Sequence, residues 1–365
     1  MAIDRFAPPM TSRERVLTAM RRIGIPDRTP FEISWGAFTP GLMKVFRERT
    51  GSQLDPAEYF DFDTRSVNLN PTSKATDFSP WFDDLLPPNV IWDEWGYGAV
   101  QGSLEHFLEY RYHPLAGCTS VDQILEFDWP DVDADYRFEG IAERTRAYQD
   151  RGYAVTAELY MTIFETAWLM RGMENLLLDF YRNEDLAHAI FEKLTELRIR
   201  QARKYAEIGV DVLRLGDDIA MQKGPMMELE LYRKFLKERT RRIIAAAKNV
   251  RKDILIFMHS DGSVKEFIPE YIDIGVDILN PVQPECNDLA EIGRRYNDEI
   301  SFWGGIGTQT TMPYGSNEEV VRKVKEVREQ LGSKGGLLIA PSHILEPEVP
   351  WENVLAFVEA VRGTR

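Results

Sequence analysis

Short apolar runs alternate with amphipathic helical patterns along most of this chain, and this alternation restricts the fold more than any other feature. Regular strand–helix alternation predicts an α/β protein whose parallel strands are joined by helices. At this number of strands, a closed (β/α)8 barrel, the TIM barrel, is favoured over an open doubly wound sheet. The eight predicted strands cover residues 31–35, 63–70, 153–158, 210–216, 254–259, 276–280, 300–305 and 336–340.

The segments between these runs carry the apolar spacing of helices that bury one face. A cap at Thr11, with Glu14 three residues later, predicts a helix over residues 11–23. This helix precedes the first strand, so we expect an N-terminal helical extension to the barrel. The other predicted helices cover residues 42–49, 141–150, 184–207, 229–248, 264–274, 289–296, 317–331 and 351–361.

The length of the chain leaves room for an insertion. A barrel of this type needs about 250 residues, and this chain has 365. Residues 71–117, after the second strand, interrupt the alternation and are rich in Trp, Pro and Gly. Two aromatic runs inside this segment, 90–101 and 107–112, have the pattern of strands that pair as a hairpin. We therefore expect one barrel domain over residues 1–365 with an irregular insertion at about 71–117.

Composition narrows the classes of partner and of location. The formal charge of −15 argues against nucleic acid and against an anionic membrane surface, because both require clustered Lys and Arg. The two cysteines are too few for a disulfide framework, which suggests a reducing compartment. No apolar run approaches the length of about 18 residues that a membrane span needs, and the N-terminus lacks the apolar core of a signal peptide. We expect a soluble, cytoplasmic protein.

Polar residues follow six consecutive predicted strands at the points where the strands end. The carboxyl ends of parallel strands meet at one mouth of a barrel, so we expect these side chains to line one pocket. If the backbone stays extended after residue 258, His259 and Asp261 leave from the same face. Each residue alone could instead cap the next helix, and Asp217 or Asp218 is most readily explained that way. The candidates are Glu158, Asp217, Asp218, His259, Asp261, Asn280, Gln283, Gly305 and His343.

Other chemically capable residues have simpler explanations. His106 and His113 lie in the predicted insertion, and His188 lies inside a predicted helix, where packing or surface exposure accounts for a histidine. Cys286 follows the sixth strand closely enough to act as a ligand, yet a lone cysteine is more often a small buried apolar residue. No GxGxxG string follows any predicted strand, so the sequence gives no support for a dinucleotide site.

Four long strings carry a resemblance to a known family. They read GDDIAMQKGPMM, MHSDGSVKEFIPEYIDIGVDILNPVQPE, FWGGIGTQTTMPYG and GGLLIAPSHIL. The chain resembles the uroporphyrinogen decarboxylase superfamily and, within it, the branch of corrinoid- and folate-linked methyltransferases. The resemblance implies a (β/α)8 barrel, in agreement with the strand count.

The resemblance to the decarboxylases themselves has gaps. Those enzymes carry an arginine-rich motif after the first strand, which helps to neutralise the many carboxylates of the porphyrinogen. Here residues 32–38 read EISWGAF, without an arginine. Asn68 and Asn70 stand near the place of the catalytic aspartate, whereas His343 is similar to a histidine near the eighth strand. An acidic chain without an arginine cluster is poorly suited to such a polyanion.

Zinc-dependent methyltransferases of the superfamily use a His-x-Cys pair after the fifth strand and another cysteine near the eighth. This sequence resembles them at His259 but has Asp261 and His343 at or beside the cysteine positions. These three residues therefore form either an altered zinc site, to which Glu158 could add an oxygen, or no metal site. Harder ligands also shift the preference away from thiolate chemistry.

The resemblance therefore implies methyl transfer between a corrinoid protein and tetrahydrofolate or another small compound. No cobalamin-binding DxHxxG string occurs here, so we expect the corrinoid on a separate partner protein. Family members often form homodimers. A decarboxylase or other lyase that uses the same pocket is the alternative, and a non-catalytic binding barrel is a third. On the first hypothesis His259, Asp261 and His343 are catalytic, and Glu158, Asp217, Asp218, Asn280, Gln283 and Gly305 bind substrate, with Asp217, Asn280 and Gln283 pairing with the pterin ring.

Overall fold

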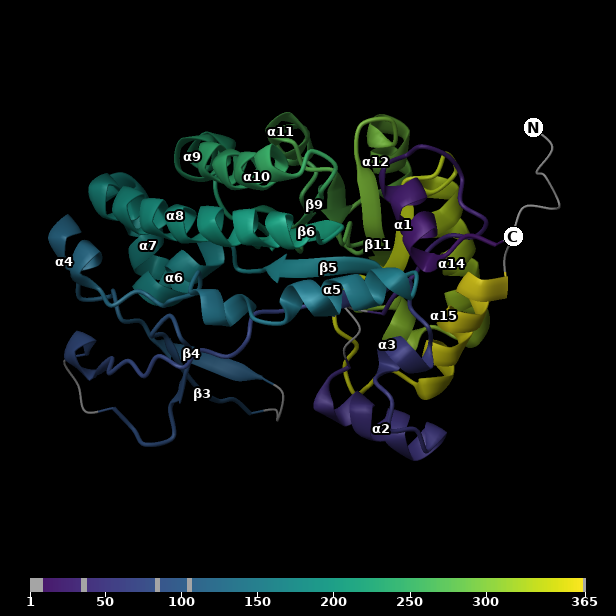
Figure 1. Ribbon diagram of the computed structural model, residues 1–365, viewed down its shortest axis with the longest axis horizontal. Coiled ribbons are helices and arrows are strands. Elements are labelled where there is room, and N and C mark those ends of the chain that lie inside the picture. The colour runs from purple at the N-terminus through teal and green to yellow at the C-terminus, as the bar shows by residue number, and fades with distance from the viewer. Residues whose placement is uncertain (1–8, 34–37, 83–85, 104–106, 364–365) are drawn as a thin grey trace.

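A single curled parallel sheet forms the centre of the molecule (Figure 1). The computed structural model describes residues 9–33, 38–82, 86–103 and 107–363. Within these residues the sheet has seven strands, each hydrogen-bonded to the next, and their order follows the chain. The α/β, TIM-barrel-like prediction is thereby confirmed. The strands are β1 (Thr64–Val67), β5 (Ala154–Leu159), β6 (Val212–Gly216), β9 (Leu255–His259), β10 (Ile278–Asn280), β11 (Ser301–Ile306) and β12 (Leu337–Pro341).

The place of the predicted first strand, residues 31–35, is filled by single bridges. Phe31 pairs in parallel with Ile339 of β12, and its carbonyl accepts a hydrogen bond from the Asp63 amide at 3.1 Å, next to β1. This segment therefore joins the two edges of the curled sheet. A longer ladder is limited at its start because Pro30 has no amide to donate. Residues 34 and 35 of the prediction lie outside the described part of the chain.

The helix α1 (Ser12–Met20) closes the amino end of the strands. Thr11 and Glu14 form the predicted capping box. Val16 and Met20 on the buried face of α1 belong to one apolar cluster with the first residues of several strands, among them Val212 and Leu255. Because α1 covers this end, the carboxyl ends of the strands form the accessible mouth. Chemistry therefore has to be sought at that mouth.

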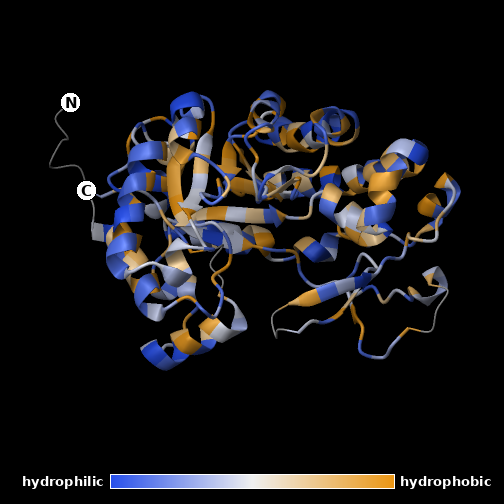
Figure 2. Cartoon of the chain, turned by 180° about the vertical axis from the view of Figure 1, so that it is seen from behind, coloured by the Kyte–Doolittle hydropathy of each residue, from blue (hydrophilic) through white to orange (hydrophobic). Residues whose placement is uncertain are grey.

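Most of the remaining helices pack around the sheet, and Figure 2 shows their mixed polar and apolar surfaces around mostly apolar strands. Pro269 lies in the first turn of α11 and explains why this helix starts at 268 rather than at the predicted 264. A π-helical turn, Arg233–Lys237, interrupts the predicted helix 229–248. The helices are α2 (Pro40–Thr50), α3 (Pro56–Tyr59), α5 (Ile141–Asp150), α8 (Glu184–Ile208), α9 (Leu229–Tyr232), α10 (Glu238–Val250), α11 (Ile268–Ile274), α12 (Leu289–Tyr296), α13 (Thr311–Tyr314), α14 (Asn317–Leu331) and α15 (Trp351–Gly363).

The insertion after β1 forms a small antiparallel sheet of its own, β2 (Ile91–Trp92), β3 (Gly98–Gln101) and β4 (Leu108–Tyr112). The predicted pairing of the two aromatic runs is confirmed by the β3–β4 ladder, and the first run also folds back on itself as β2–β3. The insertion continues through α4 (Val121–Glu126) and packs against α6 (Phe164–Arg171), where Tyr110 meets Trp168 edge-on. The next helix, α7 (Met173–Arg182), precedes α8.

Among the described helices, none is both long enough and apolar enough to span a bilayer.

Candidate active site

His259, the last residue of β9, is held in one orientation by its neighbour on β10. The side-chain amide of Asn280 donates from Nδ2 to the Trp303 carbonyl at 2.7 Å, so its Oδ1 is left to accept. The distance from that oxygen to His259 Nδ1 is 2.6 Å. This pairing assigns the proton to Nδ1 and leaves Nε2 as the nitrogen available at the mouth. Since parallel pairing aligns Asn280 with His259, the strand register itself creates the contact.

Two carboxylates lie beside Nε2 of His259. Asp218 Oδ1 is 3.7 Å and Asp261 Oδ1 is 4.0 Å from Nε2. The Asp261 amide donates to Asp218 Oδ1 at 2.7 Å, which ties the loops after β6 and β9 together. Both carboxylates keep about a third of their side-chain surface exposed, at 33% and 30%. We call Asp218, His259 and Asp261 the His259 cluster.

Burial is the main cause that raises the pKa of Asp261. The negative charges of Asp218 and Glu285 raise this pKa further, whereas His259 and His343 lower it. Asp261 therefore holds a proton at higher pH than an ordinary aspartate. His343 is exposed and lies close enough to Asp261 to lower the pKa of that carboxyl. The predicted trio of His259, Asp261 and His343 therefore lies at one mouth.

The donor atoms of the His259 cluster would suit a cation. One donor atom from each of Asp218, His259 and Asp261 lies within 4.8 Å of the others. The third member of this trio is Asp218, whereas the predicted third ligand was His343. One imidazole nitrogen and two carboxylate oxygens form a harder set than the thiolates of a zinc–thiol site. The trio fits a divalent cation by composition, whereas it fits thiolate activation poorly.

Asp217 caps a helix, but the helix is α6, which precedes β6, and not the next helix that the sequence suggested. Its carboxylate accepts hydrogen bonds from the amides of Ile163, at 3.0 and 3.2 Å, and Glu165, at 2.9 Å, at the start of α6. Burial nevertheless raises its pKa to about 6. The neighbouring Glu165 accepts from the Asp218 amide at 3.1 Å, and burial together with Asp218 raises its pKa well above the usual range. Glu165 was not among the predicted site residues, because it follows no predicted strand.

Two further predicted substrate-binding residues have partners within the protein. Gln283 Oε1 accepts from the Gly262 amide at 3.1 Å and orders the loop that follows β9. A Cβ on Gly305 would come within 2.7 Å of Val327 Cγ1 on α14, so close packing of this helix on β11 explains the glycine. Both residue types are accounted for without a ligand, and a role in substrate binding remains a prediction.

A buried ion cluster lies inside the sheet below the mouth. Arg214 on β6 is fully buried and donates twice to Glu32, at 3.0 and 3.1 Å, and once to Glu158 at 3.3 Å. The Trp303 indole also donates to Glu32, at 2.9 Å. Burial raises the pKa of Glu158, although the charge of Arg214 opposes the shift. Sequence analysis missed Arg214, yet a charged residue within the apolar run VLRLG was a usable signal.

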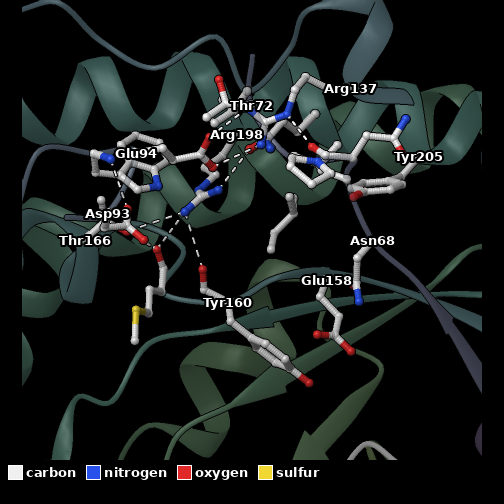
Figure 3. A pocket seen from close by; sticks show the side chains of 18 of the residues that line it. Asn68, Thr72, Asp93, Glu94, Arg137, Glu158, Tyr160, Thr166, Arg198 and Tyr205 are labelled. Atoms are coloured by element: carbon white, nitrogen blue, oxygen red, sulfur yellow. Dashed lines mark hydrogen bonds and ion pairs between the residues drawn. The ribbon is translucent and has the colours of Figure 1, made fainter. Parts of the chain in front are cut away.

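A cavity of about 490 Å³ opens between the ends of β1 and β5 and the insertion. Figure 3 shows Asn68, Glu158 and Tyr160 on one side and Arg137 and Arg198 on the other. The Tyr160 ring meets the His259 ring edge-on, with centroids 6.2 Å apart. This cavity and the His259 cluster are therefore neighbours at the same mouth. Its aromatic lining consists of Trp92, Trp95, Tyr97, Tyr160 and Tyr205.

The two other histidines in the described part of the chain have partners elsewhere in the protein. His106 lies outside the described residues. His113 Nδ1 is bonded to the Leu169 carbonyl at 2.6 Å, and His188 packs on the Phe235 ring with centroids 4.7 Å apart. The packing roles predicted for His113 and His188 are thus confirmed.

The sequence model of the family described as uroporphyrinogen decarboxylase (URO-D) matches residues 154–364 of this chain. The chain belongs to the uroporphyrinogen decarboxylase family. Members of this family are enzymes, with decarboxylases and methyltransferases among them. The matched region includes Glu158, the His259 cluster and His343, and it excludes the insertion.

Individual relatives within the family are distant. The uroporphyrinogen decarboxylase of Coxiella burnetii is 25% identical over 256 residues, 67% of each chain. That of Chlorobaculum parvum is 21% identical over 251 residues, which cover 66% of this chain and 68% of the relative. A methyltransferase from Methanosarcina mazei superposes with a TM-score of 0.69 at 17% identity, over 97% of this chain and 99% of that one. The superposition shows a shared fold.

The two arginines of the cavity are held by acceptors within the protein, Arg137 by a carboxylate and Arg198 by neutral groups. Arg137 makes two hydrogen bonds to Glu94, at 2.7 and 3.1 Å, and one to the Asn70 carbonyl. Arg198 donates from its three nitrogens to the Thr162 carbonyl, the Met161 carbonyl and Gln201 Oε1. Among the described residues that line the cavity, every Lys or Arg is thus committed to the protein.

Proposed function

We propose that this protein is a methyltransferase that moves a methyl group between a corrinoid carried by a partner protein and tetrahydrofolate or another small methylated compound. The observation that carries the proposal is the His259 cluster, in which Nε2 of an oriented imidazole faces the mouth beside two carboxyl groups. Such a group can give or take a proton at an atom that gains or loses a methyl group. The shared fold of the Methanosarcina mazei methyltransferase is compatible with this chemistry.

Proton delivery is the step that this chain would supply. The corrinoid, when bound through its partner, supplies the cobalt centre that exchanges the methyl group. The tertiary nitrogen of a methylated pterin leaves poorly until it is protonated. Asp261 is suited to this task because its raised pKa keeps the acid form populated at higher pH, and His259 lies 4.0 Å away to relay the proton. His343 is near enough to act on the charge of Asp261.

Decarboxylation is the rival, and the names of the curated relatives favour it. A porphyrinogen with many carboxylates needs several uncommitted cations. The cavity offers Arg137 and Arg198, which are each held by protein acceptors, and freeing either would leave buried partners unsatisfied. The lack of an uncommitted guanidinium group among the described lining residues therefore favours methyl transfer over decarboxylation of a polyanion.

The test is turnover of methylcobalamin with tetrahydrofolate, followed by the change in cobalamin absorbance. We expect transfer by the wild type and a loss of roughly a hundredfold or more in His259→Ala, because proton transfer by a positioned group contributes about that factor. His188→Ala, which alters a packed histidine away from the mouth, serves as the control and should keep its rate.

Two measurements complete the test. Release of CO2 from uroporphyrinogen without any methyl transfer would establish the rival. Failure to transfer methyl groups with folate, with a thiol and with a methoxyarene would contradict the proposal. Elemental analysis of the wild type and of His259→Ala separates a metal-dependent version from a metal-free one: stoichiometric metal that is lost in the variant would assign a cation to the His259 cluster.

A further inference from the structure

The residues expected to pair with a pterin ring already have partners in the protein. Asp217 caps α6, Gln283 orders the loop after β9, and Asn280 holds both His259 and the Trp303 carbonyl. Recruiting any of them for a ligand would break a buried hydrogen bond and leave its partner unsatisfied. A ring that binds at this mouth therefore needs other polar groups to read its edge.

The cavity beside β1 and β5 offers such groups on one wall. Glu158 is tied to Arg214 through Oε1 at 3.3 Å and keeps 19% of its side-chain surface exposed. Asn68 is exposed on the same side, and its amide bonds to no other residue in the described part of the chain. Figure 3 shows the Asn68 amide next to the Glu158 carboxylate. A carboxylate beside an amide complements a ring edge that carries adjacent N–H and C=O groups.

Aromatic side chains contribute to the other walls, beside the charged side chains of Asp93, Glu94, Arg137 and Arg198. Five aromatic side chains line the cavity, and its volume of about 490 Å³ falls within the usual range for small-molecule sites. Aromatic faces favour a planar ligand in offset or edge-on contact. The two arginines are committed elsewhere, so phosphate or clustered carboxylates would find no free cation among the described lining residues. The cavity thus suits a planar, uncharged heterocycle.

We propose that this cavity binds the planar nitrogen heterocycle of the methyl-carrying substrate, with the N–H edge of the ring on Glu158 and Asn68. Tyr160, which contacts both the cavity and the His259 ring, marks the side of the ring from which the methyl group is exchanged. The inference rests on the proposed function only in calling the ring a methyl carrier. It assigns the substrate class to a cyclic amide or amidine, as in a pterin, and it assigns recognition to residues outside the His259 cluster.

Calorimetric titration with 5-methyltetrahydrofolate, without any corrinoid, tests the binding site separately from methyl transfer. In Glu158→Gln an acceptor becomes a donor at nearly constant size, so affinity should fall roughly tenfold to a hundredfold. Asn68→Ala, at an exposed position, should weaken binding by several-fold without affecting folding. Glu207→Gln, an exposed change on α8 away from the cavity, is the matched control and should bind like the wild type.

A second ring makes the test specific for the edge. Quinoxaline has a similar bicyclic plane without the N–H edge, and it should bind weakly and equally to all four proteins. His259→Ala should keep the affinity for 5-methyltetrahydrofolate while losing methyl transfer. Unchanged affinity in both Glu158→Gln and Asn68→Ala, or absence of binding by the wild type, would overturn the inference even if methyl transfer to another compound were found. Intact, Glu158-dependent binding without methyl transfer would instead count against the proposed function alone.

Discussion

At the residue scale, the amide of Asn280 decides which nitrogen of His259 faces the mouth, because it donates to the Trp303 carbonyl and accepts from Nδ1. The two carboxylates are then placed around Nε2 by the loops that follow β6 and β9. Fixed orientation of a proton-transferring group is a large part of its catalytic value. The reactive geometry thus depends on residues that need not touch a substrate.

Asp217 provides a pH-dependent test of its burial, which raises its pKa although the backbone hydrogen bonds at the start of α6 lower it. Its pKa of about 6 in the folded protein lies above its ordinary value of 3.8, so the native state binds a proton that the unfolded chain lacks between these values. This contribution favours folding below about pH 4 and is lost as the pH rises through 6. The difference of about two units corresponds to up to about 3 kcal/mol.

Urea unfolding of the wild type and of Asp217→Asn at pH 4.5 and pH 7 measures this effect. Asn cannot titrate, so the stability of the wild type relative to the variant should be greater at the lower pH. An identical pH dependence of the two proteins would show that Asp217 does not change its protonation state on folding.

The convergence of His259, Asp261 and Asn280 at one mouth could be predicted, because it follows from strand ends alone. The direction of each side chain could not. Asp217 and Asp218 are adjacent in sequence, yet one turns to α6 and the other to His259. That difference depends on backbone geometry at the end of β6. Likewise, the commitment of Arg137 to Glu94 involves residues 43 positions apart within an irregular segment.

At the element scale, the close approach of β11 to the loop after β10 shapes the mouth. Gly304 has φ +133°, and a Cβ there would lie 2.3 Å from the Pro281 carbonyl oxygen. The next amide, of Gly305, donates to that same oxygen at 3.0 Å. Gly304 therefore keeps β11 and the residues after Asn280 in register. This contact explains why residue 304 is a glycine, and the close packing of α14 explains why residue 305 is one.

Gly304→Ala should destabilise the protein by roughly 3 kcal/mol or more, since it combines an unfavourable φ with a backbone clash. It should also slow methyl transfer, because Asn280 lies next to the displaced segment. Gly117→Ala is the control: a Cβ there meets nothing within 4 Å, so its effect should stay within about 0.5 kcal/mol. Thermal melting of both variants measures the difference, and equal melting temperatures would contradict the packing argument.

The regular elements followed from periodicity, whereas the exceptions depend on contacts between elements. Strands 210–216 and 254–259 and helix 317–331 were predicted almost to the residue, since apolar spacing decides them. The bridge at Phe31 and the π turn at Arg233–Lys237 were not predicted. Both are set by tertiary contacts of the sheet edges and of α8 with α10, which a local pattern does not encode.

At the scale of the whole molecule, α1 closes one end of the sheet and the insertion covers part of the other. The insertion docks on α6 through Tyr110 and Trp168, and the same helix is capped by Asp217 from the end of β6. As a result, one mouth combines the His259 cluster, which lies in the region matched by the family, with a cavity wall from the insertion, which lies outside that region. The insertion therefore supplies aromatic walls of the cavity, whereas Glu158 and Asn68, which we propose to contact the ring edge, lie outside it.

A crystal structure of the protein with 5-methyltetrahydrofolate tests this account most directly. We expect the ring to lie between the aromatic side chains of the cavity, with its N–H edge on Glu158 and Asn68. Its methyl-bearing nitrogen should face His259 and Asp261. A ring bound instead in the groove of about 570 Å³ between α12 and α14, or anywhere remote from His259, would contradict it.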